Sequence, residues 1–170
     1  RSRGLGDVYK RQDDKRWINY CKSSIGEALM LLDRWADAQN YLQTDDQYDA
    51  TTRIRNYKLL GDFQRHKKRW SKAISFYKQA LELATTQGRQ RDRAELIIRI
   101  CACLFNLKRR KSVPDYVSSI LTTLQRQKAY NYLAQYYLIL GHYAFTDAGT
   151  GDFQYILEMY QRCLEYALCY

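Results

Sequence analysis

An internal repeat with a period of 35 residues is the feature that most constrains how this chain folds. Residues 25–27 (Ile-Gly-Glu) recur as residues 60–62 (Leu-Gly-Asp), and Arg34–Trp35 recurs as Arg69–Trp70. A period of this length is the signature of a solenoid, in which each unit buries its apolar face only by stacking on its neighbours. The sequence therefore predicts a stack of similar units that share one continuous core.

The second copy resembles the tetratricopeptide repeat. That family places an aromatic residue, Leu-Gly, a turn, Ala, a large aromatic residue and Ala-Leu in this order, and the matching residues here are Tyr57, Leu60, Gly61, Ala73, Tyr77, Ala80 and Leu81. Gln64 departs from the pattern, because the family usually has an aromatic residue there. The residues expected to pack the repeats together are Gly26, Trp35, Ala38, Tyr57, Leu60, Gly61, Trp70, Ala73, Tyr77, Ala80, Gly141 and Tyr160.

The resemblance implies an all-α fold, a right-handed superhelical solenoid of about four antiparallel helix hairpins with a concave groove. We expect helices at residues 14–31 and 34–48, 50–66 and 69–87, 90–108 and 114–126, and 128–146 and 152–169. The third pair matches the family least well, although its apolar residues still form two stripes. Pro114 suits the first turn of a helix, where its missing N–H costs nothing.

Both ends of the chain are unusual. Residues 2–12 resemble the translation of a transposase adapter used to prepare sequencing libraries, so residues 1–12 are interpreted as an artefactual leader and residues 13–170 as the repeat domain. The stretch 154–170 is apolar and periodic to its last residue, without the polar face that usually closes such an array. We therefore expect the repeat domain to be truncated at both ends.

The composition argues against several classes of protein. The net charge of +10 is basic without being extreme, and no apolar run approaches the roughly eighteen residues that a membrane span needs. The five cysteines form no C-x-x-C pair and have no His nearby, which predicts reduced thiols in a cytoplasmic protein, with no metal and no cofactor. His66 and His142 have no triad partners and no phosphate-binding loop is present, so we expect no catalytic residue and no enzyme.

The groove is the best candidate for a ligand site. In the tetratricopeptide family, ligands lie along the first helix of each hairpin, on residues before and after the Leu-Gly pair. The resemblance assigns to this groove Tyr20, Ser23, Glu27 and Met30 in the first repeat, Arg55, Lys58, Asp62 and Arg65 in the second, and Gln135, Leu138, His142 and Phe145 in the fourth. Ser23 and Glu27 do not match the Lys and Asn with which chaperone-binding members hold a C-terminal carboxylate. Either the cations of the second repeat grip an acidic peptide, or they are ordinary surface charges.

A second candidate is a row of basic turns, here called the basic rim. It consists of Lys67, Lys68, Arg69, Lys108, Arg109, Arg110 and Lys111. Turns at equivalent places of a solenoid line up along one edge, so the two clusters should be neighbours. A basic edge attracts nucleic acid or acidic partners, and it also serves simply to keep a protein in solution.

The main functional prediction is a module that binds a protein or a peptide. Hairpins of this length also resemble those of bacterial regulators that sense signalling peptides, in which a helix-turn-helix domain precedes the repeats. The alternative is a protein associated with nucleic acid, either weakly through the basic rim or through a missing N-terminal domain. We expect no contact with a membrane.

Overall fold

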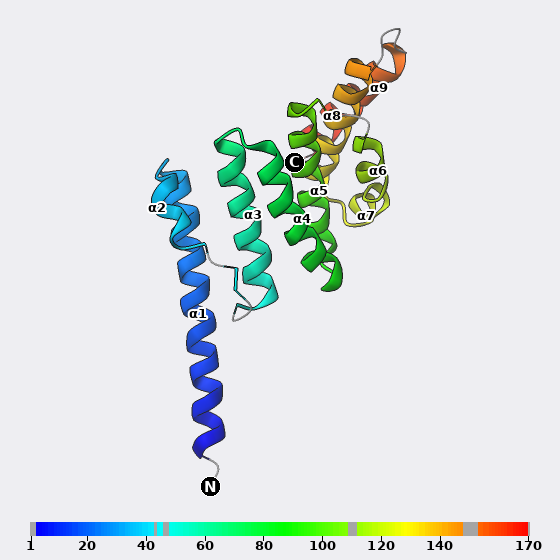
Figure 1. Cartoon of the computed structure of the whole chain (residues 1–170). Coiled ribbons are helices and arrows are strands. Elements are labelled where there is room, and N and C mark those ends of the chain that lie inside the picture. The colour runs from blue at the N-terminus through cyan, green and yellow to red at the C-terminus, as the bar shows by residue number, and fades with distance from the viewer. Residues whose placement is uncertain (1–2, 43, 46–47, 109–111, 148–152, 170) are drawn as a thin grey trace.

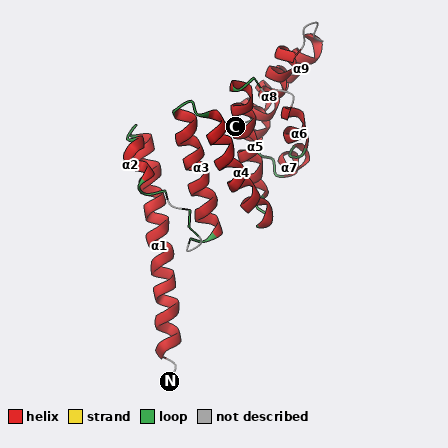
Figure 2. Ribbon diagram, in the orientation of Figure 1, coloured by secondary structure: helices red, strands yellow, loops and turns green. Residues whose placement is uncertain are grey.

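The structure, a computed structural model, describes residues 3–42, 44–45, 48–108, 112–147 and 153–169. In these residues the chain forms helices and no strand (Figure 2). The helices are α1 (Arg3–Leu31), α2 (Trp35–Gln39), α3 (Ala50–His66), α4 (Trp70–Thr86), α5 (Gln90–Asn106), α6 (Val113–Ser118), α7 (Leu121–Arg126), α8 (Tyr130–Asp147) and α9 (Phe153–Leu168).

Successive helices pack as antiparallel neighbours and form a curved row. α3 packs on α4, α4 on α5, and α8 on α9, while the short helices α6 and α7 lie against α5 and α8. Figure 1 shows the row running from α1 at one end to the hairpin of α8 and α9 at the other. The predicted all-α solenoid of stacked hairpins is therefore confirmed.

Close helix packing depends on the glycines of the repeat. A Cβ atom added to Gly61 would lie against the ring of Tyr77 on α4, and one added to Gly141 would lie 2.8 Å from Cε1 of Tyr160 on α9. At Gly26, the same atom would lie 2.7 Å from Cδ2 of Leu42. A helical glycine opposite a larger side chain therefore sets the helix spacing in the first, second and fourth hairpins.

The hairpin turns end their first helices with a residue in the left-handed conformation. Asp33, Lys68 and Lys108 have φ values of 62°, 56° and 58°. After Lys68 the backbone N–H of Arg69 donates to the carbonyl of Gln64 at 2.9 Å, the pattern that satisfies the last carbonyls of a helix. Two residues of the basic rim therefore have a structural position in the backbone of the turns.

The core consists of two hydrophobic clusters. The larger cluster extends from α3 to α9 and includes Tyr77, Leu96, Ile100, Leu124 and Leu133, all at most 1 % exposed. The smaller cluster joins the first hairpin to α3 and consists of Met30, Ala38, Leu42, Leu59 and Leu60. The family residues Ala38, Ala73, Tyr77 and Ala80 are all fully buried, as the repeat pattern predicts.

The predicted helix 34–48 is wrong in length. α2 ends at Gln39, and Asn40 to Leu42 form a turn that brings Leu42 into the core. No apolar residue follows Leu42 until Tyr48, so a longer helix would have had no face to bury. Asp49 then accepts hydrogen bonds from the backbone N–H groups of Thr51 and Thr52, which starts α3.

The predicted helix 114–126 is interrupted. It consists of α6 and α7, separated at Ser119 and Ile120. The hydroxyls of Ser118 and Ser119 donate to the carbonyls of Asp115 and Tyr116, which competes with continued helix formation. Val113, Val117, Ile120 and Leu124 are all buried, so their spacing matches that of one helix although the backbone breaks.

Further boundaries differ at the N-terminal end. α1 begins at Arg3, so most of the segment interpreted as a leader continues the helix that was predicted for residues 14–31. Across the described part of the chain, no helix combines the length and apolar character that a bilayer span requires.

Candidate functional site

A row of charged side chains crosses the first helices of successive hairpins. At its N-terminal end the guanidinium of Arg55, on α3, pairs with the carboxylate of Glu27 on α1. Arg55 also donates to the hydroxyl of Ser24 at 3.1 Å, and its guanidinium lies 5.1 Å from the ring centre of Tyr20. The predicted groove residue Arg55 is thus bound on several sides to α1.

The row continues from α3 to α5 through four ionic groups. Nζ of Lys58 lies 3.1 Å from Oε1 of Glu95, and Nη1 of Arg99 lies 2.6 Å from Oδ1 of Asp62. Arg99 also pairs with Glu95 within α5 at 2.8 Å. The pairs Lys58–Glu95 and Asp62–Arg99 join α3 to α5, the first helices of the second and third hairpins.

Asp62 has three partners in the row. Its Oδ1 accepts a hydrogen bond from the phenol of Tyr77 at 2.7 Å in addition to the one from Arg99. Arg65, one turn along α3, lies 3.5 Å from the same oxygen, and its side chain is 44 % exposed. Arg65 is therefore the most weakly held of the predicted groove cations.

Burial and pairing together set the protonation of this row. Burial by itself would raise the pKa of Glu95, but Lys58 and Arg99 outweigh burial and hold that pKa below its usual value. Burial raises the pKa of Tyr77, and the neighbouring carboxylate of Asp62 raises it further. At neutral pH Glu95 is therefore ionised and accepts a hydrogen bond from Arg99, and Tyr77 is a neutral phenol that donates to Asp62.

The C-terminal part of the groove is more apolar. The phenol of Tyr132 on α8 donates to Glu95 at 3.2 Å and extends the row to this helix. The ring of His142 lies edge-on to Phe105 and to Tyr160, with ring centres 6.3 Å and 5.9 Å apart. Gln135, Leu138 and Phe145 are exposed on α8.

Two residues assigned to the groove in the first repeat lie elsewhere. Ser23 is fully buried and donates to Oδ1 of Asn56 at 2.6 Å, and Met30 belongs to the smaller core cluster. Both residues therefore pack towards α3 and are not groove residues. Tyr20 and Glu27 do contact Arg55.

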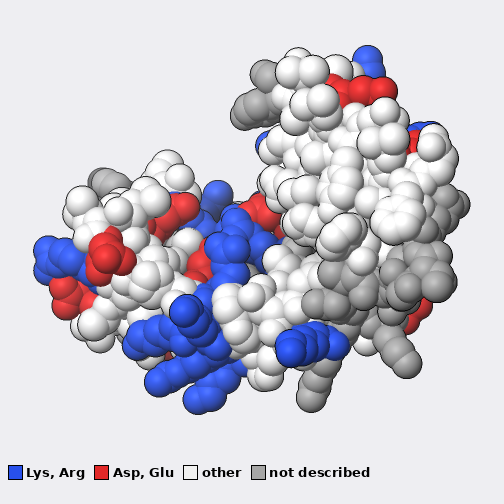
Figure 3. All heavy atoms as spheres, turned by 90° about the horizontal axis from the view of Figure 1, so that it is seen from above, with Lys and Arg blue, Asp and Glu red and all other residues white. Residues whose placement is uncertain are grey.

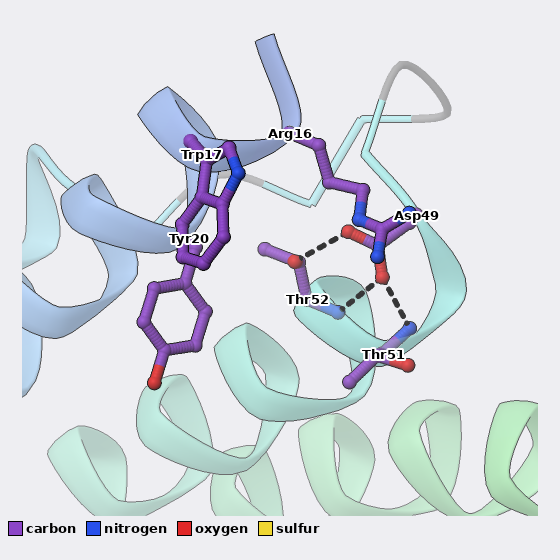
Figure 4. Close-up of a pocket in the computed structure, with 6 residues that line it drawn as sticks. All are labelled: Arg16, Trp17, Tyr20, Asp49, Thr51 and Thr52. Atoms are coloured by element: carbon purple, nitrogen blue, oxygen red, sulfur yellow. Dashed lines mark hydrogen bonds between the residues drawn. The ribbon is translucent and has the colours of Figure 1, made fainter. Parts of the chain in front are cut away.

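A pocket lies at the end of the groove where α3 begins. It is lined by Arg16, Trp17 and Tyr20 of α1 together with Asp49, Thr51 and Thr52, and its volume is about 480 Å³. Figure 4 shows the two aromatic rings on one side and the capping carboxylate of Asp49 on the other, with Arg16 reaching towards it. Burial would raise the pKa of Asp49, but hydrogen bonds from Thr52 and Thr51 and the charge of Arg16 lower it overall.

A second pocket, here called the turn-end pocket, lies at the opposite end of α3. Side chains from four helices surround a volume of about 460 Å³, and they include Trp35, Asp62, Arg65, His66, Trp70 and Ala102. The indole of Trp35 stacks on the imidazole of His66 with ring centres 4.0 Å apart. Trp35 and Trp70 occupy equivalent places in the first two repeats, so the repeat itself builds both sides of this pocket.

The basic rim lies beside the turn-end pocket. Lys67, Lys68 and Arg69 follow α3 directly, and Nζ of Lys67 lies over the ring of Phe63. Lys108 follows α5, which ends at the same edge of the molecule as α3 (Figure 1). Arg109, Arg110 and Lys111 lie outside the described residues, so the predicted neighbourhood of the two clusters is not established.

Figure 3, viewed onto this edge, shows a hollow between the N-terminal hairpin and the C-terminal part of the molecule. Basic and acidic side chains alternate at the floor of this hollow, and further basic side chains gather outside it.

Within the described residues, no group of three or more His, Cys, Asp or Glu side chains is arranged to hold a metal ion.

Sequence reasoning missed two members of the row, Glu95 and Arg99. Both belong to the third unit, where the family pattern is weakest. Arg99 lies 37 residues after its partner Asp62. Projecting the groove positions of the second repeat forward by about one period would therefore have found both residues.

The comparisons with known proteins agree with this architecture. The model of a family described as "Tetratricopeptide repeat" matches residues 57–94, which run from Tyr57 through α4 into α5. The chain therefore carries a tetratricopeptide-type repeat. Such repeats generally mediate protein–protein interaction and generally act as non-enzymatic scaffolds. A search of curated proteins finds no match.

A solved structure has the same fold along nearly the whole length of the chain. The chain is similar to "Crystal structure of BtubC (BKLC) from P. vanneervenii", with a TM-score of 0.69 and 18 % sequence identity. The likeness covers 98 % of this chain and 73 % of that one. At this identity the likeness shows the fold alone, a helical-repeat solenoid.

Proposed function

We propose that this chain is a binding module that holds a peptide segment of a partner protein in the groove along α1, α3, α5 and α8. The observation that supports the proposal is the charged row from Glu27 to Tyr132, in which polar groups of four successive first helices contact one another. A rigid concave surface with a few placed polar groups and apolar neighbours is the usual form of a ligand site.

The length of the groove sets the length of the peptide. The two pockets lie at opposite ends of α3, which has 17 residues and is therefore about 25 Å long. An extended peptide advances by about 3.3 Å per residue, so about seven or eight residues span the two pockets. Aromatic rings at the start of α3 and along α8 are suited to apolar side chains of such a peptide.

A role as the sensor of a bacterial regulator stays a prediction within this proposal. It was based on the length of the hairpins, and it requires the same groove to recognise a signalling peptide. The basic rim gives the competing site for an acidic partner or nucleic acid, and the experiment that tests the groove also separates these two surfaces.

The test has two steps. Peptides that bind the protein are selected first, and their binding is then measured on a variant whose groove is filled by a larger side chain. Random twelve-residue peptides displayed with free or with blocked carboxyl ends are selected on the protein, and enriched peptides are titrated by fluorescence anisotropy. Ala102→Trp should fill the groove and weaken binding at least ten-fold, on the order of 1.4 kcal/mol. Gln79→Trp on the exposed side of α4 is the matched control and should bind normally.

Two results would contradict the proposal. One is a failure to enrich any peptide in either library. The other is binding that survives Ala102→Trp but is lost when Lys67, Lys68 and Arg69 are neutralised together, which would place the site on the basic rim. Thermal melts of each variant establish that the fold is retained.

A further inference from the structure

We propose that the turn-end pocket is the carboxylate-binding end of the groove, with Arg65 as the residue that binds the acidic group of the peptide. This inference rests on the proposed groove function and names the chemistry of the ligand at one place in it. The cation that it selects differs from Arg55 and Lys58, although all three looked equivalent in the sequence.

The charged groups in the middle of the row carry one positive charge in excess. Lys58, Arg65 and Arg99 carry three positive charges, whereas Asp62 and Glu95 carry two negative ones. Arg65 is 44 % exposed, compared with 25 % for each of the other two cations. The excess charge is therefore most accessible to a ligand at Arg65.

The contact of Arg65 with Oδ1 of Asp62 is the longest of the three that this carboxylate oxygen makes. Oδ1 of Asp62 is already the acceptor for Arg99 at 2.6 Å and for Tyr77 at 2.7 Å, and Arg65 lies 3.5 Å from it. A guanidinium has five N–H donors and binds a carboxylate best through two parallel hydrogen bonds. Arg55, by contrast, is held by Glu27, a hydroxyl and an aromatic ring, and a ligand would have to displace those contacts.

The walls of the pocket are suited to an apolar group next to the acid. Trp70 and the stacked pair of Trp35 and His66 line its side, and Ala102 leaves room above the floor. Its volume of about 460 Å³ is enough for one large side chain with a neighbouring carboxylate. Aromatic groups on one side of an ion pair lower the local dielectric and so strengthen it.

The surroundings favour an anion as well. Lys67, Lys68 and Arg69 directly follow the pocket residue His66, and all three are exposed. They outnumber the carboxylate of Asp33, which lies 4.0 Å from Nε2 of His66. Such a cluster raises the local concentration of acidic ligands and speeds their association. The rim therefore guides the ligand, while the pocket holds it.

The carboxylate has two possible sources, an Asp or Glu side chain or the C-terminus of the peptide. Peptides enriched in the selection described above are synthesised in four forms: unchanged, with Asp and Glu replaced by Asn and Gln, with a C-terminal amide, and with both changes. Each form is titrated against the wild type, Arg65→Gln, Arg65→Lys and the control Lys78→Gln. Lys78 is exposed on α4, away from the pocket residues.

Removing the bound acid should weaken binding to the wild type and to Lys78→Gln at least ten-fold, and should have little effect on Arg65→Gln. Arg65→Lys should recover part of the affinity, because it keeps the charge and loses the two-bond geometry. The form that loses affinity identifies the source of the acid. Acid-free peptides that bind the wild type equally well would overturn the inference, and so would an acid effect that persists undiminished in Arg65→Gln. In either case, loss of peptide binding in the Ala102→Trp variant would still support the proposed function.

Discussion

Gly61 shows how one small residue sets the distance between two helices. The ring of Tyr77 occupies the space where a side chain at this position would begin, and Tyr77 is itself fully buried. Its phenol reaches past the glycine to Asp62 on the groove surface. The residue that packs the hairpin therefore also supports the charged row.

Replacing Gly61 with Ala should destabilise the protein. The added Cβ overlaps the ring of Tyr77, and overpacking of this kind costs about 1–3 kcal/mol. The measurement is the midpoint of urea unfolding. Ser75→Ala, at an exposed position on α4, is the control and should leave the midpoint nearly unchanged. An equal midpoint for Gly61→Ala and the wild type would count against the close crossing of α3 and α4.

At the scale of helices, the pairs of Lys58 with Glu95 and of Asp62 with Arg99 join α3 to α5. Pairs that are largely removed from water contribute more than exposed ones, but they also cost free energy of desolvation. The lowered pKa of Glu95 indicates that the favourable contacts outweigh the desolvation. A carboxyl group whose folded pKa is lowered stabilises the fold above its unfolded pKa, and this stabilisation is lost as the pH falls through the folded value.

Glu95→Gln should therefore remove part of the acid sensitivity of the protein. At neutral pH we expect a loss of about 1–3 kcal/mol, because two cations lose their charged partner. The difference between variant and wild type should shrink as the pH falls below the usual pKa of a glutamate, and should vanish below the lowered folded pKa of Glu95. Urea unfolding between pH 3 and pH 8 measures this, with Glu82→Gln on the exposed side of α4 as the control. A constant difference across the pH range would show that the ionised carboxylate is not the cause.

At the scale of the whole molecule, the solenoid has an unequal core. The cluster around α5 contains most of the buried side chains, whereas the first hairpin is joined to α3 through the small cluster that includes Met30 and Leu42. α2 has only five residues, and α1 exposes Ile18, Ile25 and Leu31. In repeat proteins such differences translate into different local stabilities along the chain.

Hydrogen exchange should follow this gradient. Amides of α1 and α2 should exchange at least ten-fold faster than those in the centre of α5, because opening the first hairpin exposes little apolar surface. Mass spectrometry of peptides from the three helices gives the comparison, with α4 as an internal reference. Equal protection of α1 and α5 would mean that the chain unfolds as one cooperative unit.

The sequence by itself determined the fold class, the repeat and the packing residues. The shift from Gly26 to Gly61 and from Trp35 to Trp70 reports a local unit, and such a unit can be recognised wherever its small and large residues recur. It also identified Arg55, Lys58, Asp62 and Arg65 as one helix face, since helical spacing alone puts them there.

Only the tertiary structure decided which of these charges are already paired. Glu95 and Arg99 come from the unit that matches the family least well, and their partners on α3, Lys58 and Asp62, each lie 37 residues away in the chain. The interruption of the helix at Ser119 and Ile120 could not be predicted from the sequence either. The buried residues keep the spacing of one continuous helix across it. Helical periodicity determines which residues share a face, but pairing across a groove depends on how each hairpin is rotated on the next, and that rotation is set by side-chain packing throughout the core.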